Sequence, residues 1–285
     1  MAAHPAALAV AELTGHCATA VRPLGGQLFT VRLAGGESVV AKRHDEPSAV
    51  RAETASLAWL AEPGVVRLPD VLGSDDHWLV LTLVAEGVPS GPAAAALGRA
   101  LAALHQSGAP AFGAAPPGGP VQAWIGTAEM RNEPNPLWPS WYAEHRLEPY
   151  LRLAVDAGYL DGPSAQVIGE VCGRVEELAG APERPARLHG DLWSGNVLWA
   201  GEQAWLIDPA AHGGHRETDL AMLALFGCPE LDRIVAAYRE ATPLAEGWRA
   251  RVPLHQLFPL LVHTVLFGGG YAARAAAAAR AALTA

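Results

Sequence analysis

The stretch that most constrains this chain is residues 189–196, His-Gly-Asp-Leu-Trp-Ser-Gly-Asn, followed by Leu-Ile-Asp-Pro at 206–209. It contains Asp191, Asn196 and Asp208, which supply two carboxylates and one carboxamide. These side chains can work together only if the chain between them folds back on itself. The sequence therefore has to provide a tight reversal between Asn196 and Asp208.

A β-hairpin is the predicted reversal. Two short apolar runs rich in β-forming residues flank a loop at 200–204, which is typical of a hairpin. If Trp199 pairs with Trp205, then Asn196 lies opposite Asp208 at the open end of the ribbon. The pairing would set two oxygen-bearing side chains next to each other.

Carboxylate and carboxamide oxygens suit Mg²⁺, which usually shares such ligands with substrate phosphates. The arrangement resembles the catalytic and metal-binding loops of phosphotransferases with the protein-kinase fold. In that fold an Asp handles the acceptor hydroxyl proton, and an Asn five residues later and a further Asp bind the metal. Asp191 and Asn196 have this spacing. The alternative is that the two residues only shape a turn.

Lys42 is the only lysine of the chain, and every other basic side chain is an arginine. A retained lysine indicates a site where a planar guanidinium does not fit, such as a compact ammonium that reaches phosphate oxygens. Residues 38–42, Ser-Val-Val-Ala-Lys, resemble the kinase strand that carries the phosphate-binding lysine. The alternative is an ordinary solvated lysine at the end of a strand.

Glu53 supports the site interpretation of Lys42. Residues 49–61 predict a helix after Pro47, and Glu53 falls on its apolar stripe with Val50 and Leu57. A carboxylate on an inward-facing stripe is costly unless it is paired. We therefore expect a Lys42–Glu53 ion pair of the kind that positions nucleotide phosphates in kinases. A solvated Glu53 at the edge of the stripe is the alternative.

Composition excludes several classes of protein. A net charge of −9 argues against a nucleic acid or an anionic membrane as partner, but not against ATP. The three cysteines have no CxxC spacing and indicate neither a disulfide framework nor a zinc site. We see no signal peptide, and the apolar segment 257–271 is too short and interrupted to span a bilayer. A cytoplasmic location is expected.

The chain of 285 residues, 51% of them hydrophobic, is long enough for two lobes. We expect an α+β, protein-kinase-like fold, with a small β-rich N-lobe at 1–85 that contains one key helix. A larger, mainly helical C-lobe at 86–285 would carry the catalytic hairpin.

In the N-lobe, Gly25 and Gly26 lie in a predicted strand–turn–strand and are expected at the phosphates. A buried strand at 78–84 precedes a hinge at 85–87, and the backbone of Leu81, Thr82 and Leu83 could meet an adenine edge. The same apolar run could equally be plain core. Beyond the hinge, Leu97 to His105 predicts a helix, and the Pro-, Gly- and Trp-rich residues 109–141 predict a long loop. Further helices are expected at about 141–156, 163–179, 219–226, 229–240 and 248–267, and the Ala-rich residues 272–285 have high helix propensity.

On these residues the chain resembles the fructosamine (ketosamine) kinases, a branch of the kinase-like fold related to the aminoglycoside and choline phosphotransferases. The resemblance is carried by residues 189–196, by Ile-Asp-Pro-Ala at 207–210, and by Gly-His-Arg-Glu-Thr-Asp-Leu-Ala-Met at 214–222. Leu-Phe-Gly at 225–227 and Ala237-Tyr238 continue it, with weaker support from Phe112-Gly113, Gln122, Trp141 and Arg146-Leu147.

The resemblance implies ATP-dependent phosphorylation of a sugar hydroxyl, at carbon 3, on a ketosamine adduct. That step destabilises the adduct, regenerates the free amine and so repairs glycation. Position by position it implies Asp191 as the catalytic base, Asn196 and Asp208 as Mg²⁺ ligands, and Lys42 with Glu53 on the ATP phosphates.

The sequence departs from kinase patterns in three places. The phosphate loop has only Gly25-Gly26 rather than GxGxxG, and the segment after Phe112 lacks the family's usual residues. Asp219 follows Asp208 by only eleven positions, which leaves little room for a regulated activation loop and favours a small or exposed acceptor. Rival functions are a kinase of an aminoglycoside, a choline-like molecule or an amino sugar, and an inactive ATP-binding scaffold.

Several further residues allow more than one interpretation. Arg216 could clamp a substrate anion, pair with Glu217 or brace the catalytic loop, and His215 could contact the acceptor or be structural. His212 and His215 could also bind a metal, but no cysteine or third histidine completes a set. Asp219 is expected to cap a helix or brace the catalytic loop. The side chains of Trp124, Trp138 and Trp141 could stack on a sugar, although packing is the commoner role.

Overall fold

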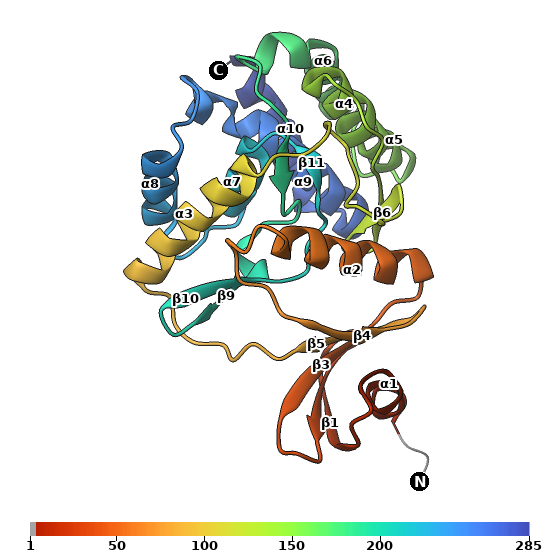
Figure 1. Ribbon diagram of the computed structural model, residues 1–285. Coiled ribbons are helices and arrows are strands. Elements are labelled where there is room, and N and C mark those ends of the chain that lie inside the picture. The colour runs from red at the N-terminus through yellow and green to blue at the C-terminus, as the bar shows by residue number, and fades with distance from the viewer. Residues whose placement is uncertain (1–3, 285) are drawn as a thin grey trace.

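The structure is a computed structural model that describes residues 4–284. Its N-terminal part is an antiparallel sheet in the order β1-β2-β3-β5-β4 (Figure 1). The strands are β1 (Ala18–Gly25), β2 (Leu28–Leu33), β3 (Ser38–Arg43), β4 (Val71–Ser74) and β5 (Trp78–Thr82). The predicted strand–turn–strand around Gly25 and the strand ending near Lys42 are confirmed. The strand expected to run to residue 84 ends at Thr82, and Leu83 is 42% exposed.

Two helices accompany this sheet. The helix α2 (Pro47–Ala61) lies between the sheet and the C-terminal part of the molecule, as Figure 1 shows. It begins at Pro47, two residues before the predicted start, because a proline at the first helical position has no N–H to leave unsatisfied. The helix α1 (Pro5–Thr14) was not predicted; it packs against β1 and β4 and ends at Gly15, whose φ is +74°.

The C-terminal part is mainly helical, and most of its predicted helices are confirmed. The expected helix at 141–156 consists of α4, one π-helical turn at 143–147 and α5. The Ala-rich end is a helix that packs on α6 and α9. The helices are α3 (Gly91–Gln106), α4 (Trp138–Tyr142), α5 (Glu148–Asp156), α6 (Gly162–Leu178), α7 (Glu217–Leu225), α8 (Leu231–Ala241), α9 (Trp248–Phe267) and α10 (Gly270–Thr284).

The prediction of one long loop at 109–141 is wrong. The segment contains a β-hairpin of β6 (Gln122–Ile125) and β7 (Ala128–Arg131), joined by Gly126 and Thr127. Alternate residues of the hairpin are buried, as expected for a ribbon with one face on the core. Each strand has only four residues, too few for the alternation to stand out among the surrounding prolines and glycines.

The predicted hairpin after Asn196 exists, but its predicted register is wrong by one residue. In β9 (Val197–Ala200) and β10 (Gln203–Leu206), Trp199 pairs with Ala204 rather than with Trp205. The loop is a two-residue turn in which Gly201 has φ +61°, so the ribbon closes more tightly than a five-residue loop allows. As a result Asn196 lies opposite Ile207, whose N–H donates to the Asn196 carbonyl at 3.1 Å.

A third ribbon holds the ends of the catalytic segment together. Strand β8 (Ala186–Leu188) precedes His189 and pairs antiparallel with β11 (His212–Gly214), which follows Asp208. One buried cluster joins both parts of the molecule: Leu57 and Leu79 from the N-terminal part pack with Leu101 and Tyr238 from the C-terminal part. The two-lobed α+β architecture is thus observed, and the boundary near residue 85 remains an interpretation. Within residues 4–284, no helix is long and apolar enough to cross a bilayer.

Candidate active site

Lys42 lies where the two lobes meet. Its Nζ is 2.8 Å from Glu53 on α2 and 3.0 Å from Asp208, which is 166 residues away in the sequence. Burial alone would lower the pKa of Lys42, but the two carboxylates hold it above its ordinary value. The predicted Lys42–Glu53 pair is confirmed, and the lone ammonium reaches the acidic group of the catalytic segment.

Glu53 is 7% exposed and contacts a second basic group that the sequence analysis missed. The Nε2 of His44 lies 3.0 Å from the Oε2 of Glu53. Burial would raise the pKa of Glu53, but Lys42 and His44 outweigh it and lower the pKa to about 2. This carboxylate is therefore ionised at neutral pH and fixed in place.

Asp191 and Asn196 are joined by hydrogen bonds that the sequence analysis did not predict. The Nδ2 of Asn196 donates to the Asp191 carbonyl at 2.8 Å and to its carboxylate Oδ2 at 3.1 Å. Burial, together with the negative charge of Asp208, raises the pKa of Asp191 to about 7, against the opposing effects of Asn196 and Lys42. A carboxylate with this pKa is suited to accept a proton near neutral pH.

The oxygen ligands fit a hard cation. Because Nδ2 of Asn196 is used for Asp191, its Oδ1 stays free to bind a metal; no hydrogen bond to this atom occurs within residues 4–284. Asp208 has a positive φ of 52° just beyond the β9–β10 ribbon, and its side chain is 41% exposed. One carboxylate and one amide oxygen, with room for water and phosphate, match the ligands that Mg²⁺ takes.

Asp219 braces the catalytic loop, as expected. Its Oδ2 accepts from the N–H of His189 at 2.7 Å and its Oδ1 from that of Gly190 at 3.0 Å. The Nε2 of His105, on α3, lies 3.2 Å from the same carboxylate; this partner is 114 residues away and belongs to no motif that would indicate it. Gly190 has φ +83°, and a Cβ there would lie 2.1 Å from the Ala210 carbonyl, so no other residue fits.

A cavity of about 640 Å³ opens next to these groups. Gly26, Lys42, Glu53, Asp191 and Asp208 all line it, so the structure brings together the charged residues of the predicted catalytic and ATP site. Gly25 and Asn196 are not among its lining residues, although Asn196 is bonded to Asp191. Leu81, Thr82 and Leu83 are not among its lining residues. Leu81 is buried in the core and Thr82 bonds to Asp70, which leaves the exposed Leu83 as the open position of the predicted adenine edge.

Arg216 and His215 lie outside this cavity. Arg216 makes two 2.6 Å hydrogen bonds to Glu183, so its alternative pairing with Glu217 is wrong. His215 is 3% exposed and packs against Trp138. It instead lines a separate cavity of about 380 Å³ between α4 and α6.

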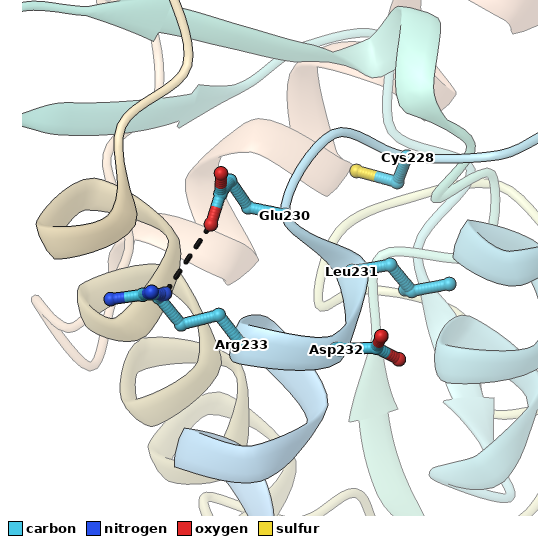
Figure 2. Close-up of a pocket in the computed structure, with 5 residues that line it drawn as sticks. All are labelled: Cys228, Glu230, Leu231, Asp232 and Arg233. Carbon is cyan, nitrogen blue, oxygen red and sulfur yellow. Dashed lines mark ion pairs between the residues drawn. The ribbon is translucent and has the colours of Figure 1, made fainter.

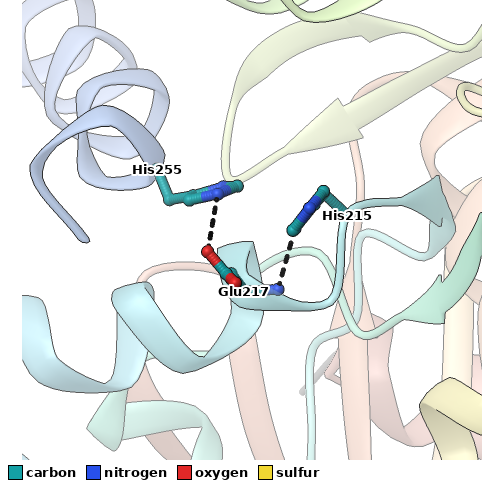
Figure 3. Close-up of side chains that lie close together, drawn as sticks. All are labelled: His215, Glu217 and His255. Carbon is teal, nitrogen blue, oxygen red and sulfur yellow. Dashed lines mark hydrogen bonds and ion pairs between the residues drawn. The ribbon is translucent and has the colours of Figure 1, made fainter. Parts of the chain in front are cut away.

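His215, Glu217 and His255 form a buried cluster whose ligand atoms lie within 4.8 Å of one another (Figure 3). His255, which comes from α9, was not expected here, and His212 is not part of the cluster. However, both oxygens of Glu217 already accept hydrogen bonds from Arg251, at 2.6 and 2.9 Å. A metal ion would have to displace this guanidinium, so the cluster is better explained as structural.

Another open hollow, of about 660 Å³, lies at the start of α8 (Figure 2). It is lined by Cys228, Glu230, Leu231, Asp232 and Arg233, with an ion pair of 3.3 Å between Glu230 and Arg233. It contains none of the residues of the Lys42–Asp191 site and has no arrangement of groups suited to chemistry.

Comparison with known proteins supports the same assignment. The sequence profile described as "Fructosamine kinase" matches residues 34–285. The chain belongs to the fructosamine kinase family. It is 34% identical over 251 residues to the "probable ketoamine kinase" of Thermus thermophilus, covering 87% of each chain. It is 35% identical over 226 residues to that of Klebsiella aerogenes, covering 76% of this chain and 75% of the relative.

Solved structures agree with this family membership. A "putative fructosamine-3-kinase" from Thermobifida fusca is 47% identical, superimposes with a TM-score of 0.92, and each chain covers 100% of the other. A macrolide 2'-phosphotransferase from Brachybacterium faecium shares the fold alone, with 18% identity, a TM-score of 0.62 and 96% coverage of each chain. The protein is therefore a kinase-like phosphotransferase of the fructosamine kinase family that acts on a hydroxyl group.

Proposed function

We propose that this fructosamine kinase family member transfers the γ-phosphoryl group of ATP to the 3-hydroxyl of a ketosamine sugar, as the first step of deglycation. The observation that carries the proposal is the meeting of Lys42, Asp208 and Asp191 at one cavity. A cytoplasmic location, where ATP is supplied, remains our expectation.

Each residue has a role that follows from its position. Lys42, held by Glu53, would contact the nucleotide phosphates, and Gly26 would bring backbone close to them. The Oδ1 of Asn196 and the carboxylate of Asp208 would hold Mg²⁺, which when bound neutralises phosphate charge and orients the transferring group. Gly25 remains a predicted part of the phosphate loop, and the backbone of Leu81, Thr82 and Leu83 a predicted adenine contact.

Asp191 is proposed to accept the proton of the attacking hydroxyl. Its Oδ2 is fixed by Asn196, and the loop that carries it is fixed by Asp219. Transfer of a phosphoryl group depends mainly on positioning and charge stabilisation, so these fixed contacts are what the protein contributes. His215 and Arg216 stay predictions as substrate-binding residues, and their partners favour a bracing role.

The test is ATP consumption by the purified protein with a fructosyl amine as acceptor. We expect turnover with the wild type and a loss of about 10²–10⁴-fold in kcat for Asp191→Asn, the size typical of a missing general base. ATP binding should persist in this variant. Unchanged turnover in Asp191→Asn would contradict the assigned role of the residue.

The identity of the acceptor is tested separately. A panel containing a fructosyl amine, an aminoglycoside, choline and an amino sugar should give the highest kcat/KM for the fructosyl amine. A preference for another member of the panel would replace the ketosamine by that acceptor. Nucleotide binding without transfer to any of them would instead support an inactive scaffold.

A further inference from the structure

The β6–β7 hairpin forms one wall of the active-site cavity. Ala123, Trp124, Gly126 and Thr127 line the cavity together with Asp191. The hairpin also lies next to α2, as Figure 1 shows. It therefore contacts both the space where reaction would occur and the helix that carries Glu53.

One hydrogen bond connects the hairpin to the start of that helix. The indole Nε1 of Trp124 donates to the Oγ of Ser48 at 3.0 Å, and Ser48 lies in the first turn of α2. One turn further along, Ala52 packs in the same buried cluster as Ala123 of β6. The next residue is Glu53. The hairpin thus bonds to the first turn of α2 and shares a buried cluster with its second turn, directly before the carboxylate that holds Lys42.

The other strand of the hairpin is attached firmly to the C-terminal helices. Arg146, which is fully buried, donates to the Arg131 carbonyl at 2.8 Å and to the Asn132 side chain at 2.6 Å. The hydroxyl of Tyr150 donates to the Glu129 carbonyl at 2.6 Å. These bonds fix the backbone of β7 on a rigid support, so β6 is a fixed surface for α2 rather than a free loop.

The guanidinium of Arg146, which anchors the hairpin, is buried without a counter-ion in the described part of the chain. Among the described residues its guanidinium forms no ion pair with a carboxylate, and burial lowers its pKa to about 10. It is stacked instead on the Trp141 ring, 4.4 Å from the centroid. A buried charge without a counter-ion is costly. Two of its three hydrogen bonds go to Arg131 at the end of β7 and to Asn132 directly after it, and the third goes to the His145 carbonyl.

We propose that Trp124 is a positioning residue that holds α2, and hence Glu53, within reach of Lys42. The C-lobe thereby keeps the Lys42–Glu53 pair assembled through the hairpin. The proposal rests on the proposed use of ATP but not on the identity of the acceptor.

The test uses Trp124→Phe and Ser48→Ala, singly and together. Phenylalanine keeps the aromatic packing and removes only the N–H donor, while alanine removes its acceptor. Each single variant should raise the Kd for Mg-ATP, measured without acceptor, roughly fivefold, the size of one hydrogen bond. The double variant should be no weaker than either single one, because both remove the same bond. Ser48→Thr, which keeps the hydroxyl, should restore binding.

Two measurements separate positioning from a general loss of stability. Hydrogen exchange of the first turns of α2 should quicken in both single variants while the amides of α9 stay protected. Trp248→Phe, at the start of α9 and remote from the cavity, is the matched control and should leave Kd unchanged. Because Kd and exchange need no acceptor, they test this proposal even if no ketosamine is phosphorylated.

Two results would overturn the proposal. If the effects of the two single variants add in the double variant, the bond between Trp124 and Ser48 is not their cause. If Trp124→Phe changes the KM for the acceptor while ATP binding and α2 exchange stay the same, the hairpin only shapes the acceptor site.

Discussion

At the scale of single residues, the site depends on one small cation between two carboxylates. The Nζ of Lys42 is 2.8 Å from Glu53 and 3.0 Å from Asp208. A single nitrogen can approach both groups because an ammonium is compact and can donate in three directions. Glu53 is further held by His44, so the carboxylate cannot turn to suit a larger cation.

Lys42→Arg should therefore not behave as a conservative change. A planar guanidinium needs more space than the gap between Glu53 and Asp208 offers, and we expect the Kd for Mg-ATP to rise at least about tenfold. Titration of nucleotide binding by calorimetry measures this. The matched control is the reverse exchange at an exposed site of the same lobe, Arg51→Lys, which pairs only with Asp76 and should bind ATP normally. Equal affinity of wild type and Lys42→Arg for Mg-ATP would show that the space between Glu53 and Asp208 accommodates a guanidinium.

At the scale of elements, the sequence was informative where pattern and chemistry agreed. The stripe on α2 predicted both the helix and the inward direction of Glu53. The spacing of Asp191 and Asn196 placed both in one catalytic segment, and the structure shows that they are hydrogen-bonded. Short ribbons were predicted less well. The register of β9–β10 depends on whether the turn has two or five residues, and either choice leaves apolar residues on both strands.

Contacts between side chains from distant parts of the sequence could not be predicted. His105, His255 and the anchor Arg146 acquire their roles only from neighbours brought close by packing, 114 residues apart in the case of His105 and Asp219. Neither histidine lies in a local motif, and the Arg146-Leu147 pair gave no indication of what the arginine contacts. The hairpin β6–β7 was missed for a related reason, because its two short strands are defined by the helices beneath them.

Helix packing gives a prediction with an internal control. Gly98 on α3 faces α8 so closely that a Cβ would lie 2.2 Å from the Ile234 carbonyl, whereas a Cβ at Gly169 on α6 would meet nothing within 4 Å. Gly98→Ala should destabilise the protein by about 1–3 kcal/mol through overpacking. Gly169→Ala should stabilise it by about 0.5–1 kcal/mol, because alanine is the better helix former. Urea unfolding of both variants measures this, and similar effects in both would contradict the close approach of α3 and α8.

At the scale of the whole molecule, four buried histidines have lowered pKa values and so favour the neutral form. Burial lowers the pKa of each below its ordinary value, to about 3 for His212. Two of them lie at the two ends of the catalytic segment, and two belong to the cluster with Glu217. They are His189, His212, His215 and His255. These histidines bind protons more readily in the unfolded chain than in the folded one. The folded protein should therefore lose stability in mild acid.

The sign of this effect follows from the depressed pKa values. The contribution is complete above about pH 6.5, the pKa of an unfolded histidine, and is lost as the pH falls below it. For His212, whose pKa is about 3 in the folded protein, this cost should approach about 1.4 kcal/mol per pH unit below that point. The other three histidines act in the same direction. Urea unfolding between pH 7.5 and 5 measures the slope. This range lies above the titration of Glu217 and Asp219, whose pKa values are lowered. Asp191, whose pKa is raised to about 7, titrates within the range with the opposite sign and offsets part of the loss.

His212→Asn isolates one contribution. Asparagine can keep the hydrogen bond from the ring Nδ1 to the Ala210 carbonyl but cannot be protonated in this range. We expect a slope shallower by about 1.4 kcal/mol per pH unit. His16→Asn, at an exposed position, is the control and should follow the wild type. A slope unchanged by His212→Asn would mean that this ring is protonated in the folded protein.

The short connection between Asp208 and Asp219 has a consequence for how such an enzyme is governed. Residues 209–217 contain no serine, threonine or tyrosine, and Thr218 is buried against His255. A signalling enzyme acting on this stretch would find no hydroxyl to modify. Phosphorylation of this stretch therefore cannot switch the enzyme on, and the catalytic segment takes up its working arrangement as the chain folds.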